Sequence, residues 1–343
     1  MLIRTRSSLW SFLLLLCLAS IFWSGCGTST TTPAPTTTIS TATKSNPSSS
    51  LQLTGLIHSP SELKLADIQA FPKVSVTTDA QAGQGRLGTH TYSGALLYDV
   101  LQKAQIKIDA ARKNDILRKV VLITGTDKYS VAVSLGEIAP RFAAKKILLA
   151  YELDGKALPT KDGFVRLIVP GDSFAGRYVS NVARVEVRDA GTLPTLGTRT
   201  PSSILYVIGA VKTPTRYDLQ ALKALKTTNI TVLGGQSAST SYSGVLLTDL
   251  LASVGGVQLK AGSKNDFLRK GIVATGTDGY SCMIVGGEID AHFAHAPMLV
   301  ALSMNNNALP ASDGFTRLIV PGDQAMGRFV SNLMELQVVD FAS

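Results

Sequence analysis

The feature that most constrains this chain is a long internal repeat. Residues 157–181 read ALPTKDGFVRLIVPGDSFAGRYVSN and residues 308–332 read ALPASDGFTRLIVPGDQAMGRFVSN, with 18 of 25 positions identical at an offset of 151. Residues 113–134 and 264–285 match at 12 of 22 positions with the same offset. A period of about 150 residues is too long for a solenoid unit and fits a whole domain. The sequence therefore predicts a tandem duplication of one fold.

The two copies are expected at residues 51–189 and 203–343. Between them, residues 190–202 contain glycine and two prolines and are interpreted as a connector. The 343 residues therefore divide into a leader of about 50 residues and one domain present twice.

Each copy mixes strand and helix patterns. Short β-branched runs over residues 74–77 and 230–233 indicate strands. Leucine and valine recur at helical spacing over residues 94–104 and 244–254. The continuous apolar run over residues 120–123 predicts a buried strand over residues 120–124. Short strands interleaved with few helices favour an α+β fold with mixed β-sheets.

The first residues predict export. Arg4 and Arg6 precede an apolar run over residues 9–23, as in a secretory signal. The following sequence WSGCG resembles a bacterial lipobox, with a tryptophan where an aliphatic residue is usual. That resemblance implies a signal peptide over residues 1–26 and Cys26 as the lipid-modified residue. An ordinary signal peptide cleaved nearby is the alternative.

A polar linker follows the lipobox-like sequence. Residues 28–50 contain 18 Ser, Thr or Pro out of 23, so the linker over residues 27–50 cannot bury a core and should behave as an extended stalk. We therefore expect a lipoprotein held on the extracytoplasmic face of the cell membrane, with soluble domains beyond the stalk.

Cysteine and charge narrow the function classes. The three cysteines are Cys17, Cys26 and Cys282, too few for a disulfide framework. Residues 51–343 carry 30 basic and 24 acidic residues, a net charge of +6. That excess is mild for two domains and gives no reason to expect nucleic acid as a partner.

Several motifs recur in both copies and point to one family. A Gly-Thr-Asp-x-Tyr turn stands at residues 125–129 and 276–280. The block Asp-Gly-Phe-x-Arg-Leu-Ile-Val-Pro-Gly-Asp begins at Asp162 and at Asp313, and an arginine follows near its end. Together these motifs resemble the molybdopterin-binding domain of the sulfite oxidase family. The resemblance implies that fold for both copies, and a molybdopterin cofactor and oxidoreductase activity in active members.

The chain departs from the family at the metal ligand. In active members a cysteine thiolate on the strand after the first helix binds molybdenum. A soft thiolate is a suitable ligand for such a metal. Neither copy has cysteine there, and the nearest residues are Thr77 or Thr78 in the first copy and Leu233 or Gly234 in the second. Cys282 stands on a different strand, where the first copy has Val131. We therefore expect no thiolate-held molybdenum, no other metal and no catalytic residue.

The repeated block supplies the remaining candidates for binding. Arg177 and Arg328 match a family arginine near the phosphate end of the cofactor, and guanidinium suits phosphate or carboxylate. Four neighbours would add neutral hydrogen bonds: Ser180, Asn181, Ser331 and Asn332. The alternative is that all six side chains hold the Pro-Gly-Asp turn and the last strand in place.

Three further motifs have both a structural and a binding interpretation. Lys113-Asn114-Asp115 fits a capped helical turn or a ligand loop. Asp278-Gly279-Tyr280 fits a hairpin turn or the lining of a pocket. His292 and His295 share a helical spacing, but no third ligand nearby completes a zinc site.

The sequence favours a surface-anchored, non-catalytic binding module for a small anionic ligand or an envelope protein. The export signal, the stalk, the duplication and the missing thiolate support it. The alternative is a molybdopterin-dependent oxidoreductase of the sulfite oxidase type with atypical ligation, and a purely structural envelope protein is a third hypothesis.

Overall fold

The computed structural model describes residues 47–82, 85–190, 200–233 and 239–341. The predicted signal peptide, Cys26, most of the stalk, most of the connector and Gly234 lie outside these residues. Among the described residues, no helix has both the length and the apolar character needed to cross a membrane.

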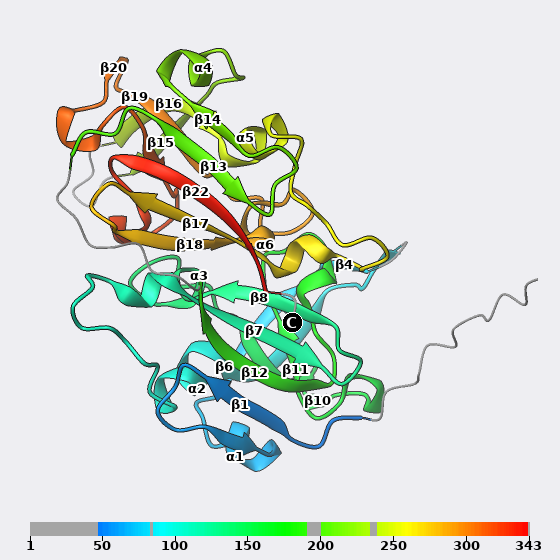
Figure 1. Cartoon of the computed structure of the whole chain (residues 1–343). Coiled ribbons are helices and arrows are strands. Elements are labelled where there is room, and N and C mark those ends of the chain that lie inside the picture. The colour runs from blue at the N-terminus through cyan, green and yellow to red at the C-terminus, as the bar shows by residue number, and fades with distance from the viewer. Residues whose placement is uncertain (1–46, 83–84, 191–199, 234–238, 342–343) are drawn as a thin grey trace, which may run out of the picture. The chain divides into compact units, whose positions relative to one another are not determined.

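The first copy, here called repeat 1, contains two sheets (Figure 1). The first sheet has the strand order β2-β1-β12-β7-β8, and β1 and β12 are parallel while the other pairs are antiparallel. Its strands are β1 Leu51–Gly55, β2 Ser61–Leu63, β7 Lys119–Gly125, β8 Ser130–Ser134 and β12 Val182–Asp189. The sheet is therefore mixed, as the sequence predicts.

The second sheet of repeat 1 is antiparallel, in the order β10-β9-β6-β3, with β11 also paired to β9. Its strands are β3 Val74–Thr78, β6 His90–Leu96, β9 Leu148–Leu153, β10 Lys156–Ala157 and β11 Arg166–Ile168. The short strands β4 Gln81–Ala82 and β5 Gly85–Arg86 form a separate hairpin. The helices are α1 Leu65–Gln69, α2 Leu97–Lys103 and α3 Leu135–Ile138.

Repeat 2 has the same arrangement. One sheet has the order β14-β13-β22-β17-β18 and the other β15-β16-β19-β20, with β21 paired to β19. The strands are β13 Leu205–Gly209, β14 Thr215–Tyr217, β15 Thr228–Leu233, β16 Ser239–Leu246, β17 Lys270–Gly276, β18 Ser281–Val285, β19 Leu299–Met304, β20 Asn307–Ala308, β21 Arg317–Ile319 and β22 Leu333–Asp340. The helices are α4 Leu219–Lys223, α5 Leu247–Ser253 and α6 Gly286–Ile289. The predicted α+β fold in two copies is confirmed.

Strand β7 is buried on both faces. Side chains alternate along a strand, so Val121 and Ile123 point into the core of repeat 1. Val120 and Leu122 point the other way and pack with Met283 of β18. The continuous apolar run over residues 120–123 is thus explained by two packing partners, one in each repeat (Figure 1).

Each repeat also inserts side chains into the core of the other. Leu117 and Phe142 belong to repeat 1 but pack in the apolar cluster of repeat 2. Leu268 and Phe293 do the reverse. The lack of a side chain at Gly327 makes room for Phe142, because a Cβ on Gly327 would lie 2.4 Å from the Phe142 ring. The two repeats therefore share their hydrophobic cores.

The predicted helix over residues 94–104 begins later than expected. Strand β6 continues to Leu96, and α2 covers Leu97–Lys103. The pairing with β9 shifts register between Ser93 and Gly94, and a Cβ on Gly94 would lie 2.2 Å from the Leu149 carbonyl oxygen. Only glycine allows the backbone of β9 to come this close to β6. The helical spacing of the leucines and valine cannot indicate such a contact.

Replacing Gly94 tests this close approach. Gly94→Ala should lower the free energy of unfolding by about 1–3 kcal/mol, because the added methyl overlaps backbone atoms of β9. Gly85→Ala is the matched control, because a Cβ there meets nothing within 4 Å. Urea denaturation of the purified proteins measures both. Equal stability of the two variants would contradict the assignment.

Candidate functional site

Arg177, the first sequence candidate, is completely buried. The 3₁₀ helix Ala175–Arg177 places it next to two carboxylates of its own repeat. Its Nη1 donates to both Glu137 carboxylate oxygens at 2.9 Å. Its Nε and Nη2 donate to Asp172 at 2.7 and 2.6 Å. The guanidinium is therefore held by two carboxylates in bidentate geometry, the arrangement that arginine prefers.

Arg328 repeats this arrangement in repeat 2. Its Nε and Nη2 donate to Asp323 at 2.8 and 2.6 Å, and its Nη1 donates to Glu288. The side chain is 2% exposed. Both arginines are thus committed to internal pairs, and neither presents its guanidinium to solvent.

The two arginines lie where the repeats meet. A Cβ on Gly287 of α6 would lie 2.5 Å from Cδ of Arg177, and a Cβ on Gly136 of α3 would lie 2.6 Å from Cδ of Arg328. Each arginine therefore packs against a helix of the other repeat. Ser134 Oγ also donates to Glu288 Oε1 at 2.8 Å, which joins the two charge clusters across the interface.

Glu137 is stabilised in its charged form. Burial by itself raises the pKa of this carboxyl, but the Arg177 and Lys145 charges outweigh burial and lower the pKa. Lys145 Nζ lies 3.3 Å from Glu137 Oε1 and 3.1 Å from Asp172 Oδ1. The cluster in repeat 1 therefore contains two cations and two carboxylates.

The cluster in repeat 2 lacks the lysine, because Ala296 occupies the place equivalent to Lys145. Burial raises the pKa of Glu288, and the attraction of Arg328 is not enough to offset it, while the charge of Glu137 raises it further. The two repeats thus hold equivalent glutamates in different electrostatic environments.

Two tyrosines of the Gly-Thr-Asp-x-Tyr turns also join the repeats. Tyr280 OH donates to the Gly327 carbonyl oxygen and accepts from Asn114 Nδ2 of repeat 1 at 3.0 Å. Tyr129 OH donates to the Gly176 carbonyl oxygen at 2.6 Å and accepts from Asn265 Nδ2 of repeat 2 at 2.9 Å. Both tyrosine hydroxyls are therefore fixed by the neighbouring repeat.

The two asparagines differ from the predicted caps. Asn114 and Asn265 precede the 3₁₀ helices Asp115–Arg118 and Asp266–Arg269 in a left-handed conformation, with φ of 53° and 51°. Neither side chain caps its helix, because each reaches across to the other repeat. The predicted capped turn is thus a helical turn whose first side chain binds elsewhere.

The neutral candidates in repeat 1 hold the turns near the last strand. Ser180 Oγ donates to Asp162 Oδ1 at 2.8 Å. Asn181 Nδ2 donates to the Lys161 carbonyl oxygen at 2.7 Å, and its Oδ1 accepts from the Ser48 N–H at 3.1 Å. These contacts agree with the alternative that the side chains hold the Pro-Gly-Asp turn and the last strand in place. Ser48, which falls in the predicted stalk, is packed against the domain.

Repeat 2 shows the equivalent contacts. Ser331 Oγ donates to Asp313 Oδ1 and Asn332 Nδ2 donates to the Ser312 carbonyl oxygen, both at 2.8 Å. Asn332 also adopts a left-handed φ of 50°, which asparagine tolerates better than most residues. These side chains therefore stabilise the same turn in both repeats.

Thr78, a sequence candidate for the place of the family's thiolate, lies at the end of β3. Its Oγ1 lies 2.6 Å from the hydroxyl of Tyr178, so the side chain is paired within repeat 1. Cys282 instead lies fully buried in the core of repeat 2, where its Sγ is 3.6 Å from the Arg328 carbonyl oxygen. Burial raises the pKa of the Cys282 thiol to about 12. Such a thiol is not a thiolate at neutral pH.

The metal interpretation of the histidine pair gains no support. His292 Nδ1 lies 3.0 Å from Asp290 Oδ1, and His295 stands in a left-handed conformation with φ of 49°. Within the part of the chain that the structure describes, no group of three or more His, Cys, Asp or Glu side chains gathers as a metal site would require.

Comparison with known proteins settles the family. The family model for the oxidoreductase molybdopterin binding domain matches residues 39–193 and again residues 199–343. The chain belongs to this family. Each repeat carries one copy of the domain.

Curated relatives match part of the chain. Sulfite oxidase of Arabidopsis thaliana is 30% identical over 149 residues, 36% of this chain and 37% of the relative. Mitochondrial sulfite oxidase of Macaca fascicularis is 31% identical over 150 residues, 37% of this chain and 26% of the relative. The match thus spans well under half the length of these relatives. The solved sulfane dehydrogenase SoxCD of Paracoccus pantotrophus aligns with 85% of this chain and 78% of its own at 14% identity and a TM-score of 0.34.

The described residues do not fit a thiolate-held molybdopterin centre at the positions that the family resemblance indicates. Strand β3 contains no cysteine, and the Thr78 hydroxyl near the expected thiolate position is hydrogen-bonded with the Tyr178 hydroxyl. The guanidinium of Arg177 is completely buried and donates to Glu137 and Asp172. A cofactor phosphate at Arg177 would have to displace those carboxylates.

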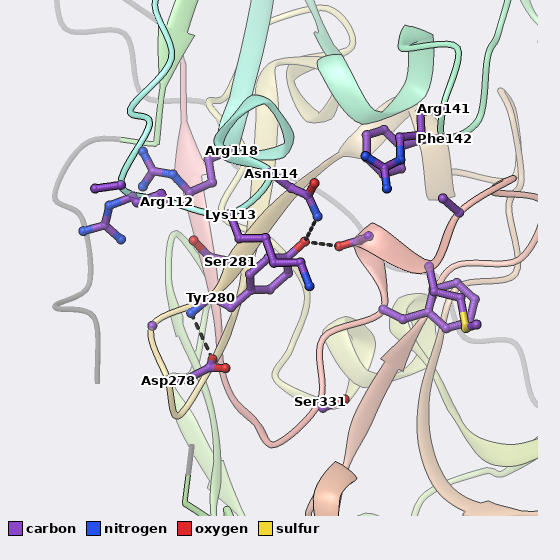
Figure 2. A pocket seen from close by; sticks show the side chains of 16 residues that line it. Arg112, Lys113, Asn114, Arg118, Arg141, Phe142, Asp278, Tyr280, Ser281 and Ser331 are labelled. Carbon is purple, nitrogen blue, oxygen red and sulfur yellow. Dashed lines mark hydrogen bonds between the residues drawn. The ribbon is translucent and has the colours of Figure 1, made fainter. Parts of the chain in front are cut away.

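The structure instead brings together two motifs that sequence spacing keeps apart. Lys113 and Asn114 of repeat 1 face Asp278 and Tyr280 of repeat 2 around a cavity of about 560 Å³ (Figure 2). Both motifs are sequence candidates for ligand contact, but nothing in their spacing indicates that they share one site. Arg141 lines the same cavity and was not a candidate. The one sequence signal for Arg141 is a difference between the repeats, because the equivalent residue in repeat 2 is His292.

Removing Lys145 tests the charge cluster. Lys145→Met should lower the free energy of unfolding at pH 7 by about 2 kcal/mol, because two charge-assisted hydrogen bonds are lost. The folded-state pKa of Glu137 lies below the ordinary value of 4.5, so its pairing stabilises the fold above that pH and is lost as the pH falls. The difference between wild type and variant should therefore hold from pH 7 down to about 5 and shrink as the pH falls below 4.5.

Urea denaturation across this pH range measures the effect. Lys146→Met is the matched control, because the neighbouring Lys146 is exposed and has no acidic partner among the described residues. A loss of the same size at every pH, or an equal loss in the control, would contradict the assigned role of Lys145.

Proposed function

We propose that this chain is an exported, lipid-anchored binding protein in which two molybdopterin-domain repeats are joined without a catalytic centre. The observation that carries the proposal is the burial of Arg177 and Arg328 in carboxylate pairs at the interface between the repeats. The family resemblance implies an arginine near the phosphate end of the cofactor, whereas here both guanidinium groups are taken up by carboxylates and pack against the neighbouring repeat.

The sequence of the described strands supports the same proposal. No cysteine stands on β3, and the thiol of Cys282 is buried in a core with a raised pKa. Ligation by Cys282 would require the core of repeat 2 to open. A sulfite oxidase activity like that named for the relatives is therefore not the function favoured for this chain.

The anchor is the second part of the proposal. Cys26 follows an apolar run and a serine-glycine pair, and a Ser, Thr and Pro-rich segment separates it from the first strand. A lipidated cysteine there would tether the two repeats at the extracytoplasmic face of the membrane, and the segment would hold them away from the lipid surface.

Metal and pterin analysis tests the absence of a catalytic centre. The full chain, purified from an export-competent host that makes molybdopterin, should contain far less than one molybdenum and one pterin per chain. Mass spectrometry for molybdenum and the fluorescence of oxidised pterin measure this. One molybdenum per chain would overturn the proposal, and its loss in Cys282→Ser would assign the ligand to that thiol.

Fractionation tests the anchor. The wild-type chain should incorporate labelled palmitate and partition with membranes, and Cys26→Ser should lose both properties because the acceptor thiol is gone. Cys17→Ser is the control, since Cys17 lies within the apolar leader. Loss of the label in Cys17→Ser, or its retention in Cys26→Ser, would contradict the assignment of the lipid to Cys26.

A further inference from the structure

We propose that the cavity between Lys113, Arg141 and Tyr280 binds a small organic anion, one that carries a carboxylate or phosphate on an apolar body. This inference rests on the proposed role as a binding protein and assigns a site and a ligand class to it. This site is separate from the buried clusters at Arg177 and Arg328. Its cations belong to repeat 1 and line the cavity together with Tyr280 of repeat 2.

The cavity has room and two distinct walls. Its volume of about 560 Å³ lies within the range typical of small-molecule sites. Repeat 1 contributes the cations Arg112, Lys113, Arg118 and Arg141. Repeat 2 contributes Tyr280, Met326 and Phe329 together with the hairpin turn at Asp278. Figure 2 shows Lys113 extending from its loop in front of Tyr280, with Arg141 beside Phe142.

The charge of the lining favours an anion. Four cationic side chains line the cavity against one carboxylate, Asp278, which accepts from the Tyr280 N–H at 3.1 Å. Arg118 is neutralised by Asp115 at 2.8 Å and Asp189 at 2.7 Å. Lys113 and Arg141 are exposed, and no acidic partner of either is found among the described residues. These two cations therefore remain available to a ligand.

The opposite wall is rigid and partly apolar. Tyr280 OH is fixed between Asn114 and the Gly327 carbonyl oxygen, so the phenol ring is held in place. Met326 is 61% exposed at the same cavity, where an apolar ligand surface would cover it. Ser281 is 3% exposed, and its Oγ has no hydrogen-bond partner among the described residues. An acceptor atom on a ligand would satisfy that hydroxyl.

The pseudo-equivalent cavity provides a comparison within the molecule. It measures about 440 Å³ and is lined by Lys264, His292 and Phe174 among others. Its lining includes His292 and Ala175 at the positions equivalent to Arg141 and Met326, and the residue equivalent to Arg112 is Ser263, which does not line it. Only one cavity of the pair therefore combines several permanent cations with an exposed thioether, so the feature does not follow from the fold itself.

Calorimetric titration of the full chain tests the site, with phenyl phosphate as the probe. We expect saturable binding with one site per chain, and weaker binding of inorganic phosphate by at least about fivefold, because it lacks the apolar body. Benzyl alcohol, which lacks the charge, should not bind. Binding of phosphate and phenyl phosphate with equal affinity would overturn the organic part of the proposal.

Variants locate the site. Lys113→Gln combined with Arg141→Gln should weaken phenyl phosphate binding by at least about tenfold, because both available cations are removed. Lys264→Gln is the matched control in the other cavity and should leave the affinity unchanged. Unchanged affinity in the double variant, or an equal loss in Lys264→Gln, would overturn the assignment. All three substituted side chains are at the surface, and thermal unfolding checks that each variant folds.

The same preparation separates this inference from the proposed function. Absence of molybdenum and pterin with no binding of phenyl phosphate overturns the anion site and leaves the non-catalytic role intact. Stoichiometric molybdenum overturns the non-catalytic role, whatever the titration shows.

Discussion

The buried pairing of two arginines with four carboxylates is the constraint on which the rest of the structure depends. A guanidinium with no exposure to water is tolerated only when its donors are matched by acceptors, and Arg177 meets that condition with Glu137 and Asp172. Gly287 of the other repeat packs against Arg177, and any Cβ at position 287 would collide with the arginine side chain. The charge pair, the small residue and the docking of the second repeat are therefore parts of one arrangement.

That arrangement is one part of a wider packing of the two repeats against each other. Each repeat leaves one face of a buried strand uncovered, and the other repeat covers it. Phe142 and Phe293 are exchanged between the cores, and Tyr129 and Tyr280 are fixed by asparagines from the opposite copy. A single copy would expose these surfaces to water, which is costly for apolar side chains and for buried charges alike.

Small differences between the copies produce an asymmetric molecule. Lys145 gives one charge cluster a second cation, whereas Ala296 leaves the other with arginine alone. Arg141 and His292 occupy equivalent places beside the two cavities, so the guanidinium of one cavity is replaced by an imidazole in the other. The duplication therefore supplied a symmetric scaffold on which single substitutions make the two cavities chemically distinct.

The sequence by itself determined the duplication, the α+β class, the main strands and the lack of cysteine in β3, because these follow from the repeated sequence, from local periodicity and from residue identity. It placed the start of α2 three residues early, since only the approach of β9 reveals why Gly94 is in a strand. The tertiary structure alone decided that Arg177 faces the other repeat and that Asn114 meets Tyr280, 166 positions away. Contacts between copies depend on how two folded surfaces fit, and no local pattern in the chain encodes that fit.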